Sequence, residues 1–106
     1  MIDVTIAPVA LAHLENIYDY TFRRWGRAQA DKYSDQLLDV IERIAARQVP
    51  WRVISADVGV DGYHYRCSAH FVYWRVARDG SIRVVAILHQ QMHQVERLRW
   101  ALDLDS

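Results

Sequence analysis

The sequence predicts an α+β fold in which a helical hairpin packs on a small antiparallel sheet, in the order β-α-α-β-β-β-α. Apolar residues recur every three or four positions in the first half of the chain and at every second position in much of the rest. A length of 106 residues fits a single domain, residues 1–106, that buries about two-thirds of its unfolded surface. Because 52% of the residues are hydrophobic, a disordered chain is excluded.

The first half of the chain predicts one strand and two helices. Residues Ile2 to Ile6 alternate in polarity and are followed by Pro8, which suits the first turn of a helix. A helical stripe extends from Val9 to Trp25, and Gly26 then marks a typical helix end. A second stripe from Ala30 to Ala45 completes an antiparallel hairpin with a tight joint. The stripes comprise Leu11, Leu14, Tyr18, Thr21, Phe22 and Trp25, and then Ala30, Tyr33, Leu37, Ile41, Ile44 and Ala45.

The second half begins with a long connection and continues as strands. Residues 48–62 have no helical period and contain one proline and two glycines, so we expect a loop with at most a short extended piece. Apolar residues then follow a period of two over residues 63–67, 70–76 and 81–89. Asp79-Gly80 lies between the last two runs, and this pair is typical of a type I′ hairpin turn.

The chain closes with a short amphipathic helix, which we expect within residues 91–104. The two preceding strands are apolar on nearly every position, so both faces of the sheet require cover. The helical hairpin covers one face, whereas the other has no evident cover within the chain. We therefore expect apolar surface that a protein partner would bury.

Charge and cysteine content restrict the class of protein. The formal net charge is zero, from 13 basic and 13 acidic residues, so we expect no direct specific binding to nucleic acid. From Gly62 to Trp100, six arginines face two acids, which leaves open either a local basic face or merely solvated positions. No apolar run approaches the roughly 20 residues of a membrane span, and no signal peptide is evident. A single cysteine, Cys67, fits a cytoplasmic protein.

The segment "LHQQMH" places His89 and His93 four positions apart, which is the spacing of zinc ligands on a helix. A zinc hydrolase of this type needs a carboxylate after the first histidine to accept a proton from the bound water, and Gln90 cannot do so. His89 also ends a predicted strand rather than lying inside a helix. We therefore expect no metal, no cofactor and no catalytic residue, because no nucleophile arrangement or phosphate-binding loop is evident either.

Four motifs in order along nearly the whole chain resemble the ParE toxins of bacterial toxin-antitoxin modules, which belong to the RelE/ParE superfamily. They are Trp25-Gly26 at the end of the first helix, "AQA" with its following Tyr and Leu from Ala28 to Leu37, the strand from His70 to Val76, and the segment from Ile87 to His93. Two positions depart from the family pattern. Trp74 replaces the usual Tyr, and His93 replaces the usual Asp.

The resemblance implies a growth-inhibiting toxin that acts on DNA gyrase and is neutralised by a ParD-like antitoxin in a hetero-oligomer. Aromatic side chains are candidate anchors for that antitoxin because they bury much area and lose few rotamers, although each of them also suits the core. The antitoxin-binding candidates are Tyr18, Phe22, Trp25, Tyr33, Trp51 and Trp74. The candidates for binding the target are Arg66, Arg75, Arg83, His89, His93 and Arg97.

Two alternatives remain open within the same superfamily. RelE-like relatives cleave messenger RNA on the ribosome, and here an arginine such as Arg66, Arg75 or Arg83 would stabilise the phosphate while His89 or His93 exchanged protons. The zero net charge favours gyrase inhibition over this activity. The second alternative is a toxin-like module that binds an antitoxin without being toxic.

Overall fold

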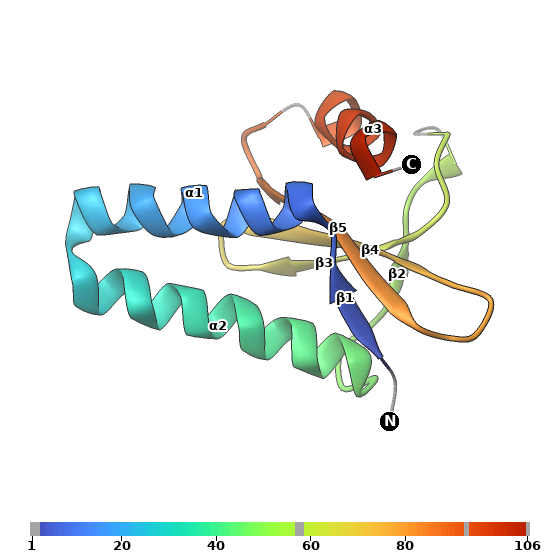
Figure 1. Ribbon diagram of the computed structural model, residues 1–106, viewed down its shortest axis with the longest axis horizontal. Coiled ribbons are helices and arrows are strands. Elements are labelled where there is room, and N and C mark those ends of the chain that lie inside the picture. The colour runs from blue at the N-terminus through green and yellow to red at the C-terminus, as the bar shows by residue number, and fades with distance from the viewer. Residues whose placement is uncertain (1–2, 57–58, 93, 106) are drawn as a thin grey trace.

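The computed structural model describes residues 3–56, 59–92 and 94–105 (Figure 1). It confirms the predicted α+β fold. None of the helices in these ranges is long and apolar enough to cross a membrane. The elements are β1 (Val4–Ile6), α1 (Pro8–Trp25), α2 (Arg27–Ala45), β2 (Arg52–Val53), β3 (Tyr63–Cys67), β4 (His70–Val76), β5 (Ile82–His89) and α3 (Gln94–Asp105).

The sheet has five strands in the order β1-β5-β4-β3-β2. Strand β1 pairs in parallel with β5, whereas the other pairs are antiparallel, so the sheet is mixed rather than wholly antiparallel. Strand β2 lies inside the expected loop and pairs Arg52 with His64. An irregularity lies between Tyr73 and Trp74, opposite one extra residue of β5, Val85. As a result, the strict alternation of faces along β5 is broken at Val85.

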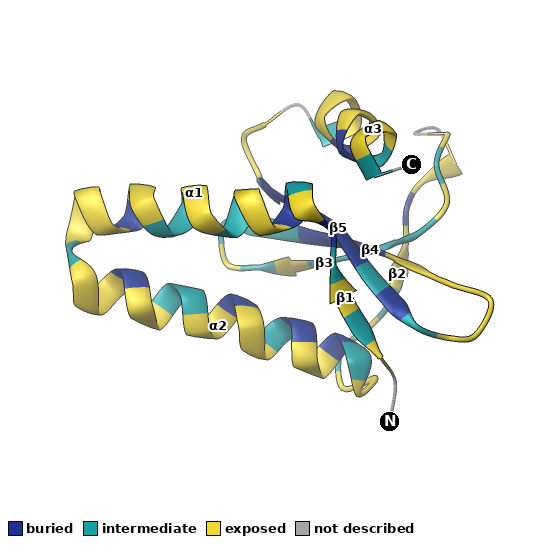
Figure 2. Cartoon of the chain, viewed as in Figure 1, coloured by how far each residue is buried: buried dark blue, intermediate teal, exposed yellow. Residues whose placement is uncertain are grey.

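Helices α1 and α2 form a hairpin that covers one face of the sheet and extends well beyond it (Figure 1). The predicted stripe of α2 is confirmed, since Leu37, Ile41 and Ile44 are buried against Val72 and Val84 of the sheet. The predicted stripe of α1 is wrong in part. Its buried positions are Ala10 and Thr21, whereas Leu11, Phe22 and Trp25 are exposed. Phe22 and Trp25 lie at the outer end of the hairpin, which has no sheet beneath it (Figure 2).

Helix α3 packs against the opposite face of β5. Leu98 and Ala101 are buried there with Val85, Ala86 and Leu88 of the strand. The expectation that this face lacks cover within the chain is therefore wrong at β5. Apolar surface remains instead on the outward sides of the helices, at Tyr20, Phe22 and Trp25 of α1 and at Trp100 and Leu104 of α3.

The two tight connections differ from each other in how well they were predicted. Gly26 alone joins α1 to α2 with φ 91° and ψ 178°, a conformation that a residue with a Cβ adopts only with strain. The predicted type I′ turn is wrong. The Ala77 carbonyl accepts a hydrogen bond from the Gly80 N–H, and the Ala77 N–H donates to the Ser81 carbonyl. Within this turn only Gly80 has a positive φ. Asp79 keeps a negative φ, so the loop has three residues, Arg78 to Gly80.

Candidate functional site

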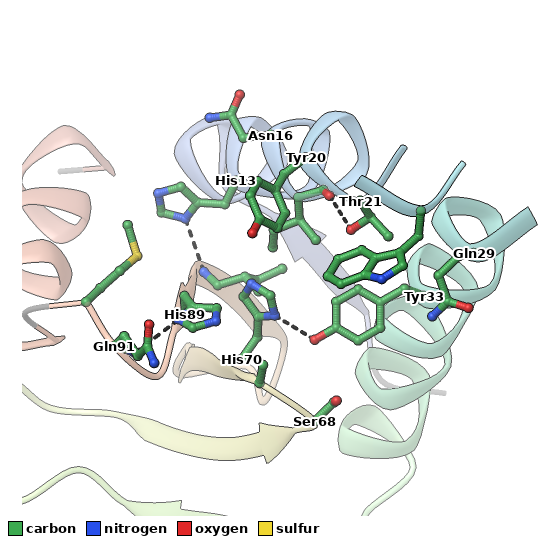
Figure 3. Close-up of a pocket in the computed structure, with 15 residues that line it drawn as sticks. His13, Asn16, Tyr20, Thr21, Gln29, Tyr33, Ser68, His70, His89 and Gln91 are labelled. Atoms are coloured by element: carbon green, nitrogen blue, oxygen red, sulfur yellow. Dashed lines mark hydrogen bonds between the residues drawn. The ribbon is translucent and has the colours of Figure 1, made fainter. Parts of the chain in front are cut away.

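A hollow of about 650 Å³ opens where the helical hairpin leaves the sheet (Figure 3). We call it the hairpin hollow. Side chains from three parts of the chain line it: one face of α1, the start of α2, and the ends of β4 and β5 that lie nearest the hairpin. They include His13, Ile17, Tyr20, Thr21 and Trp25 from α1, Gln29 and Tyr33 from α2, and Ser68, His70, Ile87, His89 and Gln91 from the sheet end.

The rim of the hairpin hollow is aromatic and open to solvent. Tyr20 is 63% exposed and Trp25 is 61% exposed, and their rings meet edge to face with centroids 6.2 Å apart. Below them, the Thr21 hydroxyl donates to the Ile17 carbonyl at 2.7 Å, which satisfies the hydroxyl within the helix. The rim therefore presents two large rings above Thr21, whose hydroxyl already donates a hydrogen bond within the helix.

The floor of the hollow consists of Tyr33, His70 and His89. The Tyr33 hydroxyl lies 2.6 Å from Nδ1 of His70, and the two imidazoles cross at 87° with centroids 5.1 Å apart. Burial, reinforced by the neighbouring His89, lowers the pKa of His70 to about 4. His70 is therefore neutral at pH 7, and its Nδ1 shares a hydrogen bond with the Tyr33 hydroxyl whose direction depends on the imidazole tautomer.

Two further hydrogen bonds fix the histidines of the hollow in place. The backbone N–H of Ile87 donates to Nδ1 of His13 at 3.1 Å, and the backbone N–H of Gln91 donates to Nδ1 of His89 at the same distance. Burial, and secondarily Arg97, lowers the pKa of His13. Each of these imidazoles therefore holds its proton on Nε2 when it is neutral.

The lining of the hollow combines aromatic rings with three histidines. Among the described lining residues there is no Asp, Glu, Lys or Arg. The described part of the chain also contains no group of three His, Cys, Asp or Glu placed to hold a metal ion. A hollow with aromatic walls and a few fixed polar groups suits an apolar or aromatic side chain of a partner.

The predicted antitoxin-binding residues fall in three places. Trp25 and Tyr33 line the hairpin hollow. Tyr18 and Phe22 lie on an adjoining face of α1, where their rings stack with centroids 6.4 Å apart. There the Tyr18 hydroxyl donates to Asp31 at 2.6 Å and ties the two helices together. Tyr18, Phe22 and Trp25 thus form an aromatic surface along the outer half of α1, and Tyr33 lies in the hollow that Trp25 borders.

The remaining two, Trp51 and Trp74, belong to the core. Trp74 is 0% exposed, so the prediction that it anchors a partner is wrong, because its ring has no surface to offer. Trp51 is half-buried, and its indole N–H donates to the Ile44 carbonyl at 3.0 Å. Its ring packs against Trp74 and Tyr63 and lies under the guanidinium of Arg47. Intramolecular contacts thus account for most of its surface.

The residues predicted to bind the target do not converge. In the strand register, Arg75 lies opposite Arg83 and Arg66 lies opposite Phe71, on the sheet face away from the hairpin. His89 points into the hollow on the other face (Figure 3). Arg97 lines a second hollow between α1 and α3. His93 lies outside the described residues.

Sequence reasoning missed several residues of the hollow, chiefly His13, Tyr20 and His70. A usable signal exists for the first, because His13, Ile17 and Thr21 repeat at intervals of four along one helix face. His70 becomes a neighbour of His89 only through the register of β4 and β5, where the two lie directly opposite each other.

Comparison with known proteins agrees with these features. The family model described as "ParE toxin of type II toxin-antitoxin system, parDE" matches residues 4–94. The chain belongs to the ParE toxin family. Among its ParE relatives, Toxin ParE1 of Mycobacterium tuberculosis is 40% identical over 88 residues, which is 82% of this chain and 88% of that protein. Toxin ParE of Escherichia coli is 36% identical over 89 residues, covering 84% of this chain and 85% of that protein.

A solved structure described as the chromosomal ParDE TA system from P. aeruginosa has the same fold as this ParE chain. The TM-score is 0.69, and the match covers 84% of this chain and 96% of the other. At 18% sequence identity this likeness concerns the fold alone. The resemblance to ParE toxins predicted from the sequence motifs is confirmed by the family match.

Proposed function

We propose that this ParE-family chain inhibits bacterial growth by acting on DNA gyrase in the cytoplasm, and that a ParD-like antitoxin neutralises it by binding along α1 and into the hairpin hollow. The single observation that carries the antitoxin site is the exposed ring pair of Tyr20 and Trp25 beside a hollow whose described lining residues include no Asp, Glu, Lys or Arg. The family description, a type II toxin-antitoxin system, supports an antitoxin as the occupant.

The hollow and the neighbouring helix face suit a segment that folds on binding. Such a segment covers a broad surface and supplies one large side chain to each pocket. The aromatic surface of Tyr18, Phe22 and Trp25 lies along α1, and the hollow opens directly beside Trp25. An amphipathic helix laid along α1 would therefore bury these rings and place one anchor between Trp25 and Tyr33.

The arrangement of side chains favours inhibition by binding over cleavage of messenger RNA. Cleavage would require a cation and a proton-transferring group around one phosphate. The candidate cations Arg66, Arg75 and Arg83 lie on one face of the sheet, whereas the candidate proton carrier His89 lies on the other. The sheet therefore lies between these arginines and the His89 ring, whereas the other candidate proton carrier, His93, lies outside the described residues.

The test of this proposal measures gyrase supercoiling with the purified chain, alone and with the protein of the neighbouring gene. We expect supercoiling to fall with the chain alone and to recover when the antitoxin is added. Induction in a bacterial host should arrest growth and activate the DNA damage response, and co-expression of the neighbouring gene should relieve both. Unchanged supercoiling together with cut ribosome-bound message would contradict the gyrase target. An intact antitoxin complex with no effect on growth would identify a binding module.

A further inference from the structure

The strands carry an uneven distribution of charge. Strands β2, β3, β4 and β5 together contain four arginines and no acidic residue. The acids lie elsewhere, with six of them on α1 and α2 beside five basic residues. The net charge of the chain is zero, but the charge of these four strands is positive. The four arginines are Arg52, Arg66, Arg75 and Arg83.

The register places all four arginines on one face of the sheet. Arg52 lies opposite His64, Arg66 opposite Phe71, and Arg75 opposite Arg83. Their shared face is the one away from the hairpin. The residues next to the arginines along the strands, such as Trp74 and Val84, point the other way, into the core under α1 and α2. The face therefore combines cations with the aromatic rings that share their register positions.

Helix α3 covers only part of this face. It packs on β5, and its Asp105 binds Arg83 through Nε at 2.8 Å and Nη2 at 2.5 Å. The hydrogen bonds from Arg83, and to a smaller extent the charge of Arg75, lower the pKa of the Asp105 carboxyl. Towards β2 and β3, in contrast, Arg52 and Arg66 are exposed while His64 and Phe71 are half-buried. We call these four residues the sheet-face cluster.

The two rings and the Arg66 guanidinium of the sheet-face cluster are in mutual contact, and Arg52 lies opposite His64 in the register. The His64 centroid lies 5.8 Å from that of Phe71, and the guanidinium of Arg66 lies 5.9 Å from the Phe71 centroid. His64 also stacks on Tyr73 with centroids 5.7 Å apart and an interplanar angle of 19°. Burial, and secondarily Arg52, lowers the pKa of His64, so its ring is neutral at pH 7. The described residues supply no hydrogen-bond partner to its buried Nδ1.

We propose that the sheet-face cluster binds single-stranded nucleic acid without sequence preference, with phosphates on Arg52 and Arg66 and a base against Phe71 and His64. Alternating exposed cations and half-buried rings on this part of the sheet match the alternation of phosphate and base along a strand. An acidic peptide would satisfy the two arginines but would leave the rings without a planar partner. The site lies on the opposite side of the sheet from the hairpin hollow, so it is separate from the proposed antitoxin site.

The experiment measures fluorescence anisotropy of a labelled 12-nucleotide oligo-dT with the full-length chain at several salt concentrations. We expect a dissociation constant of about 1–100 µM at physiological salt and tighter binding at low salt. The double variant Arg52→Gln/Arg66→Gln should weaken binding at least about tenfold and flatten the log–log salt dependence by about 1.4, since each phosphate contact on a single strand contributes about 0.7. Phe71→Leu should weaken binding about 5- to 20-fold through lost stacking.

The matched control is Arg27→Gln/Arg43→Gln, which removes the same charge from two exposed positions of α2. It should leave the affinity within about twofold. Melting temperatures of all variants establish that they are folded, and the arginine variants test the site even if Phe71→Leu is unstable. The proposal is overturned if the chain does not bind oligo-dT at low salt, or if the control weakens binding as much as the cluster variant. Equal competition by polyglutamate that also depends on Phe71 would overturn it in favour of an acidic peptide.

Discussion

At the residue scale, the four tryptophans have four different environments. Trp74 is wholly buried between the hairpin and the sheet, and Trp51 packs against it at the end of α2. Trp25 and Trp100 are exposed, the first beside the hairpin hollow and the second beside the hollow between α1 and α3. The same side chain thus stabilises the core at two positions and offers binding surface at the other two.

The split between Trp25 and Trp74 gives a direct prediction. Trp25→Ala should weaken antitoxin binding by about 2 kcal/mol, as expected for an anchoring ring, with little change in melting temperature. Trp74→Ala should cost about 3–5 kcal/mol of unfolding free energy, because it empties a core site. Titration calorimetry and chemical denaturation measure the two quantities. A lowered stability of Trp25→Ala with unchanged affinity would instead mark this ring as structural.

A second prediction at the residue scale concerns the pH dependence contributed by His70. Its pKa falls from 6.5 in the unfolded chain to about 4 in the folded one, so the unfolded state binds more protons in this range. The contribution of neutral His70 to the free energy of unfolding is complete above pH 6.5 and is lost as the pH falls to about 4. Its upper bound is about 3 kcal/mol.

His70→Asn retains an acceptor for Tyr33 without the titration. Denaturation midpoints measured between pH 4 and 7 should therefore fall less steeply in this variant than in the wild-type chain. His13 and His64 have pKa values lowered in the same direction, so they maintain part of the slope in both proteins. Identical slopes would show that His70 does not titrate as described.

At the element scale, the hairpin depends on a single connecting residue. The Gly26 N–H donates to the Phe22 carbonyl at 2.8 Å to end α1, and the Gly26 carbonyl accepts from Ala30 at 3.1 Å to begin α2. One residue thus serves both helix ends. Because the exposed rings of Phe22 and Trp25 lie directly before it, the joint also determines how the aromatic surface is presented.

Gly26→Ala isolates the cost of this backbone conformation. An added Cβ would meet no atom within 4 Å. The expected decrease of about 1–3 kcal/mol in the free energy of unfolding therefore comes from the strained positive φ alone. Chemical denaturation measures the loss, and Lys32→Ala, an exposed position of α2, should change stability by less than about 0.5 kcal/mol. A neutral Gly26→Ala would mean that the helices rearrange around a different joint.

At the scale of the whole molecule, three layers stack as hairpin, sheet and α3 (Figure 1). The third layer is a single helix, and its last turn is bound to the sheet by the bidentate pair of Arg83 with Asp105. Arg83 also donates to the Thr5 hydroxyl of β1 at 3.2 Å. The pair also relieves the repulsion expected between Arg75 and Arg83, which lie directly opposite each other.

Asp105→Asn should therefore loosen α3 from the sheet. We expect the free energy of unfolding to fall by about 1–2 kcal/mol, since the Asp105 carboxylate is largely buried but the Arg83 side chain is partly exposed. Hydrogen exchange should show faster exchange at the amides of α3, with those of α2 unaffected. Glu96→Gln changes an exposed carboxylate in the first turn of the same helix and is the control. Equal exchange in the variant and the wild-type chain would mean that Leu98 and Ala101 hold the helix without help.

Much of the fold was predictable, because periodicity is a local property. The stripe of α2, the stop at Gly26 and the strand pair β4–β5 all follow from residue spacing. The burial of α1 was not predictable, because its apolar residues lie on more than one face and only the position of the sheet decides which face is covered. The loop at Arg78 to Gly80 was mispredicted because Asp-Gly also suits a three-residue turn with glycine in the left-handed position.

The sequence by itself determined the three helices, the strands other than β2, their order and the membership of the ParE family, because each is encoded in residue spacing and short motifs. Only the tertiary structure decided which residues meet. Tyr33, His70 and His13 come from distant segments and converge on one hollow. The extra residue Val85 shifts the alternation of β5, so His89 faces the hollow while Arg83 faces the opposite side. One inserted residue exchanges the faces of all that follow it in a strand, and its effect appears only when the strands are paired.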